Sequence, residues 1–336
     1  MKKAYLFDTL EDSKVQCRLC SHRCVIKEGS RGICMVRQNN RGQLYSLVYG
    51  KLVAERPDPI EKKPLFHFLP SSYSYSIATA GCNFKCKHCQ NADISQMARD
   101  KGIIMGSDRT PEDVVKGAVN TGCASISYTY TEPTVYFEFA YDTSLIAVEH
   151  GLKNVFVTNG YMTKDTLDFI YPNLHAANVD LKAFTERFYK DICGARLEPV
   201  LKAIEGMKAQ GIWVEVTTLL IPGLNDDEKE LKDLIAFLIS VDPDMPWHVT
   251  RFHPDYRLLD RPATPVSSLK RTREMALDMG LRFVYTGNVL GEPGEDTYCP
   301  SCGELLIKRY GFYVEKNLLK DGRCFSCKAT IPGIWA

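Results

Sequence analysis

The stretch YSIATAGCNFKCKHC (75–89) decides the fold. Its first six residues form a short run without strict polar alternation, which is typical of a strand buried on both faces of a parallel sheet. Three cysteines follow that strand directly: Cys82, Cys86 and Cys89. Thiolates spaced this closely can converge on one metal centre from a single loop.

The number of thiolates in this loop limits the kind of centre it can hold. Three are one short of the four that normally close an iron–sulfur cubane, so the fourth iron would keep an open coordination site. The alternative is a zinc loop that takes a histidine, His88, as its fourth ligand. The spacing alone leaves both interpretations open.

Further strands of the same kind follow along the chain. They are ASISYTY (124–130), NVFVTN (154–159), ANVDLK (177–182), WVEVTTLLI (213–221), WHVTRF (247–252) and RFVYTGN (282–288). Helix start signals lie between them: Thr110 before a proline, Thr163 opening a segment to about residue 173, and Asn225 with Glu228 as a capping box. The alternation predicts an α/β chain that forms a partial or full (β/α) TIM-like barrel, with a doubly wound sheet as the alternative. In both folds, functional loops follow the carboxyl ends of the strands.

Composition excludes several classes of protein. Lys plus Arg is 42 against 41 for Asp plus Glu in 336 residues, a balance that makes a nucleic-acid partner unlikely, although a local patch stays open. No apolar stretch approaches the roughly 18 residues of a membrane span. The start MKKAYLFDTLEDSK lacks the apolar middle of a signal peptide. We therefore expect a soluble, cytoplasmic protein without a membrane partner.

Cysteines also gather near both ends of the chain, and disulfides are rare in a reducing cytosol, so metal is the expected use. The two terminal quartets are Cys17, Cys20, Cys24 and Cys34, and Cys299, Cys302, Cys324 and Cys327. The second consists of two CxxC knuckles around a predicted hairpin, which is close to a zinc ribbon; an auxiliary iron–sulfur cluster is the alternative. The first has irregular spacing and could hold zinc or a second cluster, with zinc favoured. The lone Cys123 and Cys193 are expected to be small buried residues.

These flanks suggest three parts. We expect a Cys-rich N-terminal module over 1–70, a (β/α) barrel over 71–290 and a zinc-ribbon-like module over 291–336, opened by the linker GEPGED.

The cysteine triad at the end of the first barrel strand resembles the radical S-adenosylmethionine (SAM) superfamily. The similarity runs from about Tyr75 to Gly287. The ordered series TEP (131–133), TNG (158–160), DLK (180–182) and IPG (221–223), with the histidine of FHP, resembles glycyl-radical-enzyme activating enzymes of the pyruvate formate-lyase type. With both flanks included, the full length is similar to the radical SAM member of the AmmeMemoRadiSam gene set.

The resemblance implies a 4Fe–4S cluster held by Cys82, Cys86 and Cys89, with SAM chelating the open iron. Reductive cleavage of SAM would give methionine and a 5′-deoxyadenosyl radical that abstracts hydrogen. The implied activity is activation of a partner glycyl-radical enzyme, and the alternative is a small molecule or modified nucleotide as substrate. Flavodoxin or ferredoxin is the implied electron donor. From another class, an iron–sulfur electron-transfer or metal-scaffold protein would explain the cysteines but not the ordered motifs.

The resemblance also implies a set of SAM contacts near the strand ends. They are His88, Thr131, Glu132, Thr158, Asn159, Asp180, Lys182 and His253. Thr131 and Glu132 would lie at the amino group, Lys182 at the carboxylate and His253 at the ribose. Thr158 and Asn159 would face the methionine or ribose part, and His88 the adenine. Val157 departs from the activases, which carry an acidic residue there, so a bound monovalent cation is not expected.

Overall fold

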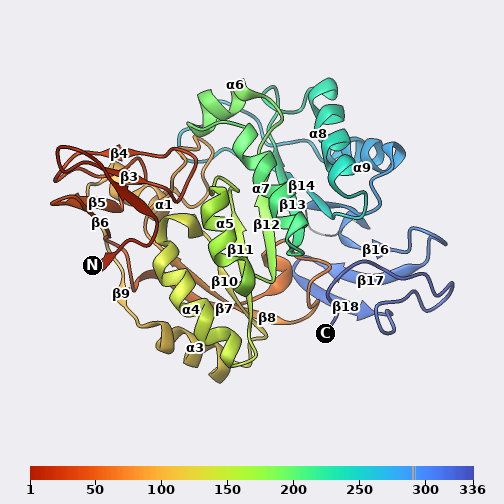
Figure 1. Ribbon diagram of the computed structural model, residues 1–336. Coiled ribbons are helices and arrows are strands. Elements are labelled where there is room, and N and C mark those ends of the chain that lie inside the picture. Colours follow the sequence, from red (N-terminus) through yellow and green to blue (C-terminus); the bar gives the residue numbers. More distant parts are fainter. Residues whose placement is uncertain (290, 292) are drawn as a thin grey trace.

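The largest sheet of the computed structural model, which describes residues 1–289, 291 and 293–336, carries the fold (Figure 1). Its strands lie in the order β15-β14-β13-β12-β11-β10-β8-β7-β9. Their bounds are β7 (Lys51–Pro59), β8 (Tyr73–Thr79), β9 (Ser107–Asp108), β10 (Ser125–Tyr128), β11 (Lys153–Thr158), β12 (Ala176–Asp180), β13 (Trp213–Leu220), β14 (Trp247–Arg251) and β15 (Val284–Gly287).

The directions of these strands define a partial barrel. Each neighbouring pair from β8 through β10 to β15 is parallel, and all seven runs predicted from the sequence form parallel strands. β7 runs antiparallel to β8, and the short β9 runs antiparallel to β7. In the described part of the chain, β15 and β9 are the two edges and do not pair with each other. The α/β prediction is confirmed, and of the two barrel forms the open one is present.

Helices follow most strands and cover the outside of this sheet (Figure 1). The longer ones are α3 (Pro111–Asn120), α4 (Phe137–Glu149), α5 (Lys164–Ile170), α7 (Glu198–Ala209), α8 (Glu228–Val241) and α9 (Val266–Met279). Shorter elements are α1 (Ala92–Ser95), α2 (Met97–Asp100), α6 (Glu186–Phe188), the 3₁₀ turns η1 (Ile60–Lys62), η2 (Pro133–Tyr136), η3 (Tyr171–Asn173) and η5 (Pro293–Glu295), and the π turn η4 (Tyr189–Cys193). No helix among the described residues is both long enough and apolar enough to cross a bilayer.

The helix start signals can be compared with the observed caps. Thr110 forms a reciprocal capping box with Asp113, and the Thr163 hydroxyl accepts a hydrogen bond from Thr166, so both predicted starts are confirmed. The prediction for Asn225 is wrong, because Asp227 caps α8. Asn225 instead accepts a hydrogen bond from the Ile221 amide and donates to the backbone carbonyls of Lys182 and Leu219. Its amide side chain has more backbone partners in that loop than a cap would offer.

The N-terminal segment forms two small antiparallel sheets that pack on the barrel. One has the order β1-β6-β5 and the other β2-β3-β4. Their bounds are β1 (Lys2–Lys3), β2 (Phe7–Thr9), β3 (Val15–Cys17), β4 (Val25–Ile26), β5 (Arg37–Asn40) and β6 (Gln43–Ser46). The hydroxyls of Thr163 and Thr166, just after β11, donate to the carbonyls of Arg18 and Leu19. The segment therefore reaches the carboxyl end of a central strand.

The C-terminal segment forms a third small sheet on the other side of the barrel in Figure 1. It consists of β16 (Thr297–Tyr298), β17 (Leu305–Tyr310) and β18 (Tyr313–Asn317), and β17–β18 is the predicted hairpin. Beyond it, Ile334 bridges Phe68, so the tail lies along the segment before β8. The predicted linker 291–296 includes Glu292, which lies outside the described residues. β7 lies in the predicted N-terminal module, but it pairs with β8 in the large sheet. The division of the chain at residue 70 stays a prediction.

Candidate functional site

One cavity of about 390 Å³ lies at the carboxyl ends of β8, β10, β11 and β12. Ten of the eleven residues predicted for the central cluster and SAM line it: Cys82, Cys86, Cys89, His88, Thr131, Glu132, Thr158, Asn159, Asp180 and Lys182. Carboxyl ends of parallel strands share one edge, which explains why motifs spread over 101 positions meet here. His253 is the eleventh residue and lies outside the lining.

The cysteine loop is held by hydrogen bonds to its backbone and sulfur atoms. Arg99 donates to the carbonyls of Phe84 (3.2 Å) and Cys82 (3.4 Å). The Phe84 amide lies 3.3 Å from the Cys82 sulfur, and the Ser95 hydroxyl lies 3.2 Å from the Cys89 sulfur. Burial raises the pKa of the Cys82 and Cys89 thiols, so their thiolates need a nearby positive charge. A metal centre would supply that charge.

The third thiol of the loop has a different environment. Cys193, at the end of η4, donates a hydrogen bond to Cys86, and this bond together with Lys182 lowers the pKa of Cys86. Cys193 is buried, as the sequence predicts for this lone cysteine. The sequence gives no sign of its contact with the cluster loop, because the two cysteines are 107 positions apart.

The spacing of the ligand atoms tests which metal centre fits the triad. A tetrahedral zinc ion with bonds of about 2.3 Å would hold thiolates about 3.8 Å apart. Among the described residues, only the C-terminal quartet brings three or more ligand atoms within 4.8 Å of one another. Neither the triad nor the triad with His88 does so. The wider spacing fits a cluster in which each thiolate binds its own iron.

Glu132 joins two motifs that the sequence presents separately. Its Oε1 accepts hydrogen bonds from the Thr134 hydroxyl (2.6 Å), the Thr134 amide (3.1 Å) and the Thr158 hydroxyl (2.7 Å). Its Oε2 accepts one from the Asn159 amide (2.8 Å). Burial nevertheless raises the pKa of this carboxyl. Glu132 therefore fixes the TNG loop against the TEP loop, and Oε2, with a single donor, has lone-pair capacity left for a ligand.

Asn159 extends this connection to the cysteine loop. Its side-chain amide donates to the Asn83 side chain at 2.7 Å and lies 3.8 Å from the Cys82 sulfur. On the other side of the loop, the Thr131 hydroxyl donates to the Thr79 carbonyl at the end of β8. The ends of β8, β10 and β11 are thus fixed to one another around the cavity.

Lys182 places a positive charge beside the cysteine loop. Its Nζ lies 3.0 Å from Asp180 Oδ2, and the side chain is largely buried. Burial opposes the charged form, but Asp180, Cys86 and Cys193 outweigh it and raise the Lys182 pKa well above its ordinary value. The lysine is therefore a fixed cation beside the cysteine loop and suits an anionic ligand group.

His88 is the neutral member of the cavity wall. Burial, with Lys182 nearby, lowers its pKa to about 3, so the imidazole is uncharged at neutral pH. Its Nδ1 is buried and has no hydrogen-bond partner in the described structure. An unpartnered buried nitrogen costs free energy unless a ligand or water satisfies it. The contact of His88 with the adenine of SAM stays a prediction.

His253 lies at the rim of the site and not in its wall. The side chain is exposed, and the Gln90 amide donates to its Nε2 at 3.1 Å. Gln90 itself lines the cavity. The proposed contact of His253 with the ribose stays a prediction.

Sequence reasoning missed other residues of the cavity lining, among them Lys63, Tyr130 and Phe312, which comes from the turn between β17 and β18. Lys63 Nζ is 2.9 Å from Asp58 Oδ2, and the Tyr130 hydroxyl also donates to Asp58. Burial lowers the Lys63 pKa to about 8, although Asp58 opposes this. The only available signal was the position of Tyr130 directly before TEP.

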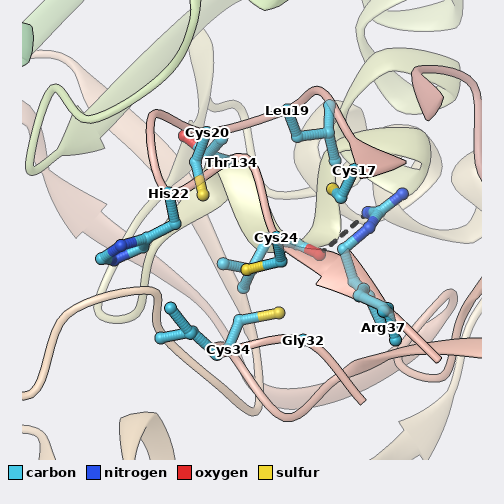
Figure 2. Close-up of a pocket in the computed structure, with 12 residues that line it drawn as sticks. Cys17, Leu19, Cys20, His22, Cys24, Gly32, Cys34, Arg37 and Thr134 are labelled. Carbon is cyan, nitrogen blue, oxygen red and sulfur yellow. Dashed lines mark hydrogen bonds between the residues drawn. The ribbon is translucent and has the colours of Figure 1, made fainter. Parts of the chain in front are cut away.

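The two terminal quartets lie in different surroundings. In the C-terminal quartet, Sγ of Cys299 is 3.6 Å from Sγ of Cys327, and Sγ of Cys302 is 3.7 Å from Sγ of Cys324. These four can hold one metal ion. The N-terminal quartet lines a separate pocket (Figure 2).

Comparisons with known proteins agree with this arrangement. The radical SAM superfamily matches residues 76–235. The chain is 49% identical over 330 residues to the uncharacterized protein MJ0808 of Methanocaldococcus jannaschii, covering 97% of this chain and 98% of that one. It is 23% identical over 192 residues to the pyruvate formate-lyase-activating enzyme of Streptococcus mutans, covering 53% of this chain and 71% of that enzyme.

A solved structure supports the same fold. Streptococcus suis SuiB bound to S-adenosylmethionine aligns with a TM-score of 0.51 at 15% identity, over 68% of this chain and 53% of that one. At this identity the likeness shows the fold alone. The matched family region runs from β8, which carries the cysteine loop, into α8, and it contains the ten predicted residues that line the cavity. The chain therefore belongs to the radical SAM superfamily.

Proposed function

We propose that this protein holds a 4Fe–4S cluster on Cys82, Cys86 and Cys89 and cleaves SAM reductively to begin radical chemistry. The observation that carries the proposal is the shared cavity, which brings three free thiols together with the Asp180–Lys182 pair and the Glu132-linked loops. The spacing of the thiols supports a cluster over a single ion. An electron-transfer or scaffold protein would have no need for this second set of polar side chains.

The bound cluster and SAM would supply the chemistry: one electron breaks a carbon–sulfur bond of SAM, giving methionine and a 5′-deoxyadenosyl radical. The protein's own residues position the reactants and exclude water. Lys182, fixed as a cation, would bind the SAM carboxylate, and Glu132 Oε2 would accept from its amino group. His88 would offer its unpartnered Nδ1 to the adenine.

We propose that the hydrogen donor enters the cavity between Lys63, Tyr130 and Phe312. A glycine in a partner protein is the first class to test, because the activating enzyme of Streptococcus mutans is a relative. A small molecule is the second class. Flavodoxin or ferredoxin would deliver the electron, in the cytoplasm, where thirteen free thiols stay reduced.

For the C-terminal quartet we propose one zinc ion. The sulfur–sulfur distances of 3.6 and 3.7 Å match the edge of about 3.8 Å expected for a Zn–S₄ tetrahedron. The small core around it, which includes Leu306 and Ile331, is too limited to hold the hairpin by itself. The metal would thus be structural.

The central proposal is tested with protein purified and reconstituted without oxygen, given SAM and dithionite. We expect 5′-deoxyadenosine from the natural sequence and only background from Cys86→Ala. Cys123→Ala, a buried cysteine outside all three clusters, is the matched control and should retain the yield within about twofold. Equal nucleoside yields from Cys86→Ala and Cys123→Ala would refute SAM cleavage at this loop.

A further inference from the structure

The N-terminal quartet forms a second centre, in which Cys17 is buried and the other three cysteines are partly buried. Cys17, at the end of β3, and the following Cys20, Cys24 and Cys34 line one pocket, and Figure 2 shows their sulfur atoms around the same space. Leu19, Ile26 and Val135 add apolar walls, and the lining is almost entirely apolar. Four free thiols do not gather in such a pocket as solvated side chains, so their arrangement points to a bound group.

The spacing of these thiols differs from that of a single-ion site. The C-terminal quartet provides the reference in the same molecule, with sulfur pairs 3.6 and 3.7 Å apart. In the N-terminal quartet, all of which is described, no three sulfur atoms lie within 4.8 Å of one another. A zinc ion would require about 3.8 Å between every pair. A cluster that binds each thiolate through a different iron requires wider separation.

A buried arginine offers the pocket a hydrogen-bond donor. Arg37 is 2% exposed and lines the pocket, and its terminal nitrogens pair with Glu138 at 2.8 and 2.5 Å. Its Nε is buried without a hydrogen-bond partner in the described structure. Such an orphaned donor is costly unless an acceptor is present. Sulfur atoms of a cluster with four thiolate ligands would be acceptors of that kind.

The pocket also adjoins the central cysteine loop. The His22 ring nitrogen Nε2 lies 2.9 Å from the Asn83 carbonyl, next to Cys82. Arg99, which holds the Cys82 carbonyl, also donates to the Ile33 carbonyl at 2.9 Å. A Cβ atom added at Gly81 would lie 2.6 Å from Val36 and 3.4 Å from the Cys34 carbonyl, so the two loops are in direct contact.

A fourth connection runs through the turn after TEP. Thr134 and Val135 line the N-terminal pocket, while the Thr134 hydroxyl and amide donate to Glu132 in the central cavity. Arg37 in turn lies 3.3 Å from the Val135 carbonyl. The two sites therefore share a wall of one short turn.

We propose that Cys17, Cys20, Cys24 and Cys34 hold a second 4Fe–4S cluster, which relays electrons to the central site. The relay rests on the proposed function, whereas the cluster itself does not. An external low-potential one-electron donor of the flavodoxin or ferredoxin class reduces the N-terminal cluster. That cluster passes the same electron to the central cluster and returns to its oxidised state, so one electron enters for each SAM cleaved.

The cluster is tested by metal analysis and electron paramagnetic resonance of the full chain purified without oxygen. In the triple variant Cys82→Ala, Cys86→Ala, Cys89→Ala, only the terminal quartets can hold metal. We expect about four irons and about one zinc per chain, and a reduced-cluster signal that SAM does not change. About two zincs without iron would overturn the proposal and identify the N-terminal quartet as a zinc site.

The relay is tested with Cys20→Ser plus Cys24→Ser, and Cys123→Ser serves as the matched control. The signal of the central cluster and its change on SAM binding report whether that site is intact. We expect the rate of central-cluster reduction by flavodoxin, divided by the rate with a photoreduced small-molecule donor, to fall about tenfold or more. An unchanged ratio would overturn the relay. If the double variant does not fold, Arg37→Lys, which removes the orphaned Nε and keeps a cation beside Glu138, should shift the signal of the N-terminal cluster in the triple variant background. An unshifted signal would contradict the assignment.

These outcomes separate the two proposals. Absence of any SAM-sensitive signal in the natural sequence would refute the proposed function and leave the iron count of the triple variant standing. A SAM-sensitive signal in the natural sequence, together with zinc in the N-terminal quartet, would support the proposed function and refute the second cluster.

Discussion

The two terminal quartets each consist of four cysteines, but the spacing of their sulfur atoms and the exposure of their side chains differ. At the C-terminus, sulfur pairs lie 3.6 and 3.7 Å apart, and Cys302 and Cys327 are exposed. At the N-terminus, no three sulfur atoms lie within 4.8 Å of one another, and the four cysteines line a largely apolar pocket. The number of cysteines therefore does not define a metal site. The separation of the sulfur atoms and the groups packed against them do.

The packing around the two quartets also differs. The C-terminal knuckle at Gly303 has open space on the side where a Cβ would lie, whereas Gly81 is pressed against the N-terminal loop. One quartet stabilises a hairpin that borders the barrel, and the other lies beside the cysteine loop of the central site. Each of the following tests would break or sharpen that contrast.

The largest effect is expected from Cys324→Ser. Structural zinc contributes about 10–16 kcal/mol in small metal-dependent folds, so loss of one ligand should unfold residues 297–331. We expect loss of zinc and rapid proteolysis of this segment, with the iron content unchanged. Cys123→Ser should remain resistant. A protease-resistant hairpin without zinc would show that its small core suffices.

A smaller loss is expected from Arg37→Met. This change leaves Glu138, which is fully buried, without its partner, at a cost of about 3–5 kcal/mol in the free energy of unfolding. Lys308→Met is the matched control, because Lys308 pairs with Glu315 on the exposed hairpin and its loss should leave the urea midpoint unchanged. Equal urea midpoints for the two variants would show that the buried ion pair near the N-terminus contributes no more to stability than the exposed pair of the C-terminal hairpin.

Mild acid should act through His67, where the C-terminal tail meets the barrel. Its imidazole contacts the Pro332 carbonyl and the Tyr285 hydroxyl, and burial lowers its pKa to about 4. The unfolded chain, with a histidine pKa near 6.5, takes up the proton first as pH falls. Stability is therefore complete above pH 6.5 and declines toward pH 4 by about 3 kcal/mol.

The measurement is the urea midpoint of the natural sequence and of His67→Asn across this range. The natural sequence should show the steeper loss. Parallel curves for the two proteins would mean that other groups cause the acid sensitivity.

The smallest difference is expected between two glycine substitutions. Gly81→Ala places a Cβ 2.6 Å from Val36 at a φ of +107°, so it should cost about 1–3 kcal/mol for the clash as well as the backbone strain. Gly303→Ala, at φ +76° with nothing within 4 Å, should cost only the strain, about 1 kcal/mol. Thermal unfolding gives the comparison, and equal shifts would argue against close contact between the N-terminal and central loops.

Much of the fold could be predicted from the sequence, because parallel strands buried on both faces read as short apolar runs. The order of TEP, TNG and DLK on successive strands also predicted that their side chains would meet. The open edges at β15 and β9 could not be predicted, since the sequence carries no record of whether distant strands pair. For the same reason, Lys63 was missed. It precedes the first barrel strand, and its contacts with Asp58 and Tyr130 hold it at the cavity.

The remaining differences concern three-dimensional distance. The CxxC spacing of the C-terminal quartet predicted a compact site correctly, because each pair of cysteines lies on one knuckle. The irregular spacing of the N-terminal quartet did not predict the separation of its sulfur atoms, so the sequence left zinc and a second cluster open, with zinc favoured. Asn225 shows the same limit on a smaller scale: its capping pattern is present, but the backbone carbonyl of Lys182, in the loop after β12, offers a competing partner.

The bridge between Phe68 and Ile334 has a consequence for the order of events during synthesis. Phe68 comes before the first parallel strand, and its partner is made 266 positions later. At about 5–20 residues per second, the ribosome takes roughly 13 to 53 s to cover that distance. The nascent barrel must therefore wait, with Phe66 and His67 uncovered, until the tail emerges. Newly made chains should be most prone to aggregation in that interval, and chaperones would find their binding surface at this end of the barrel.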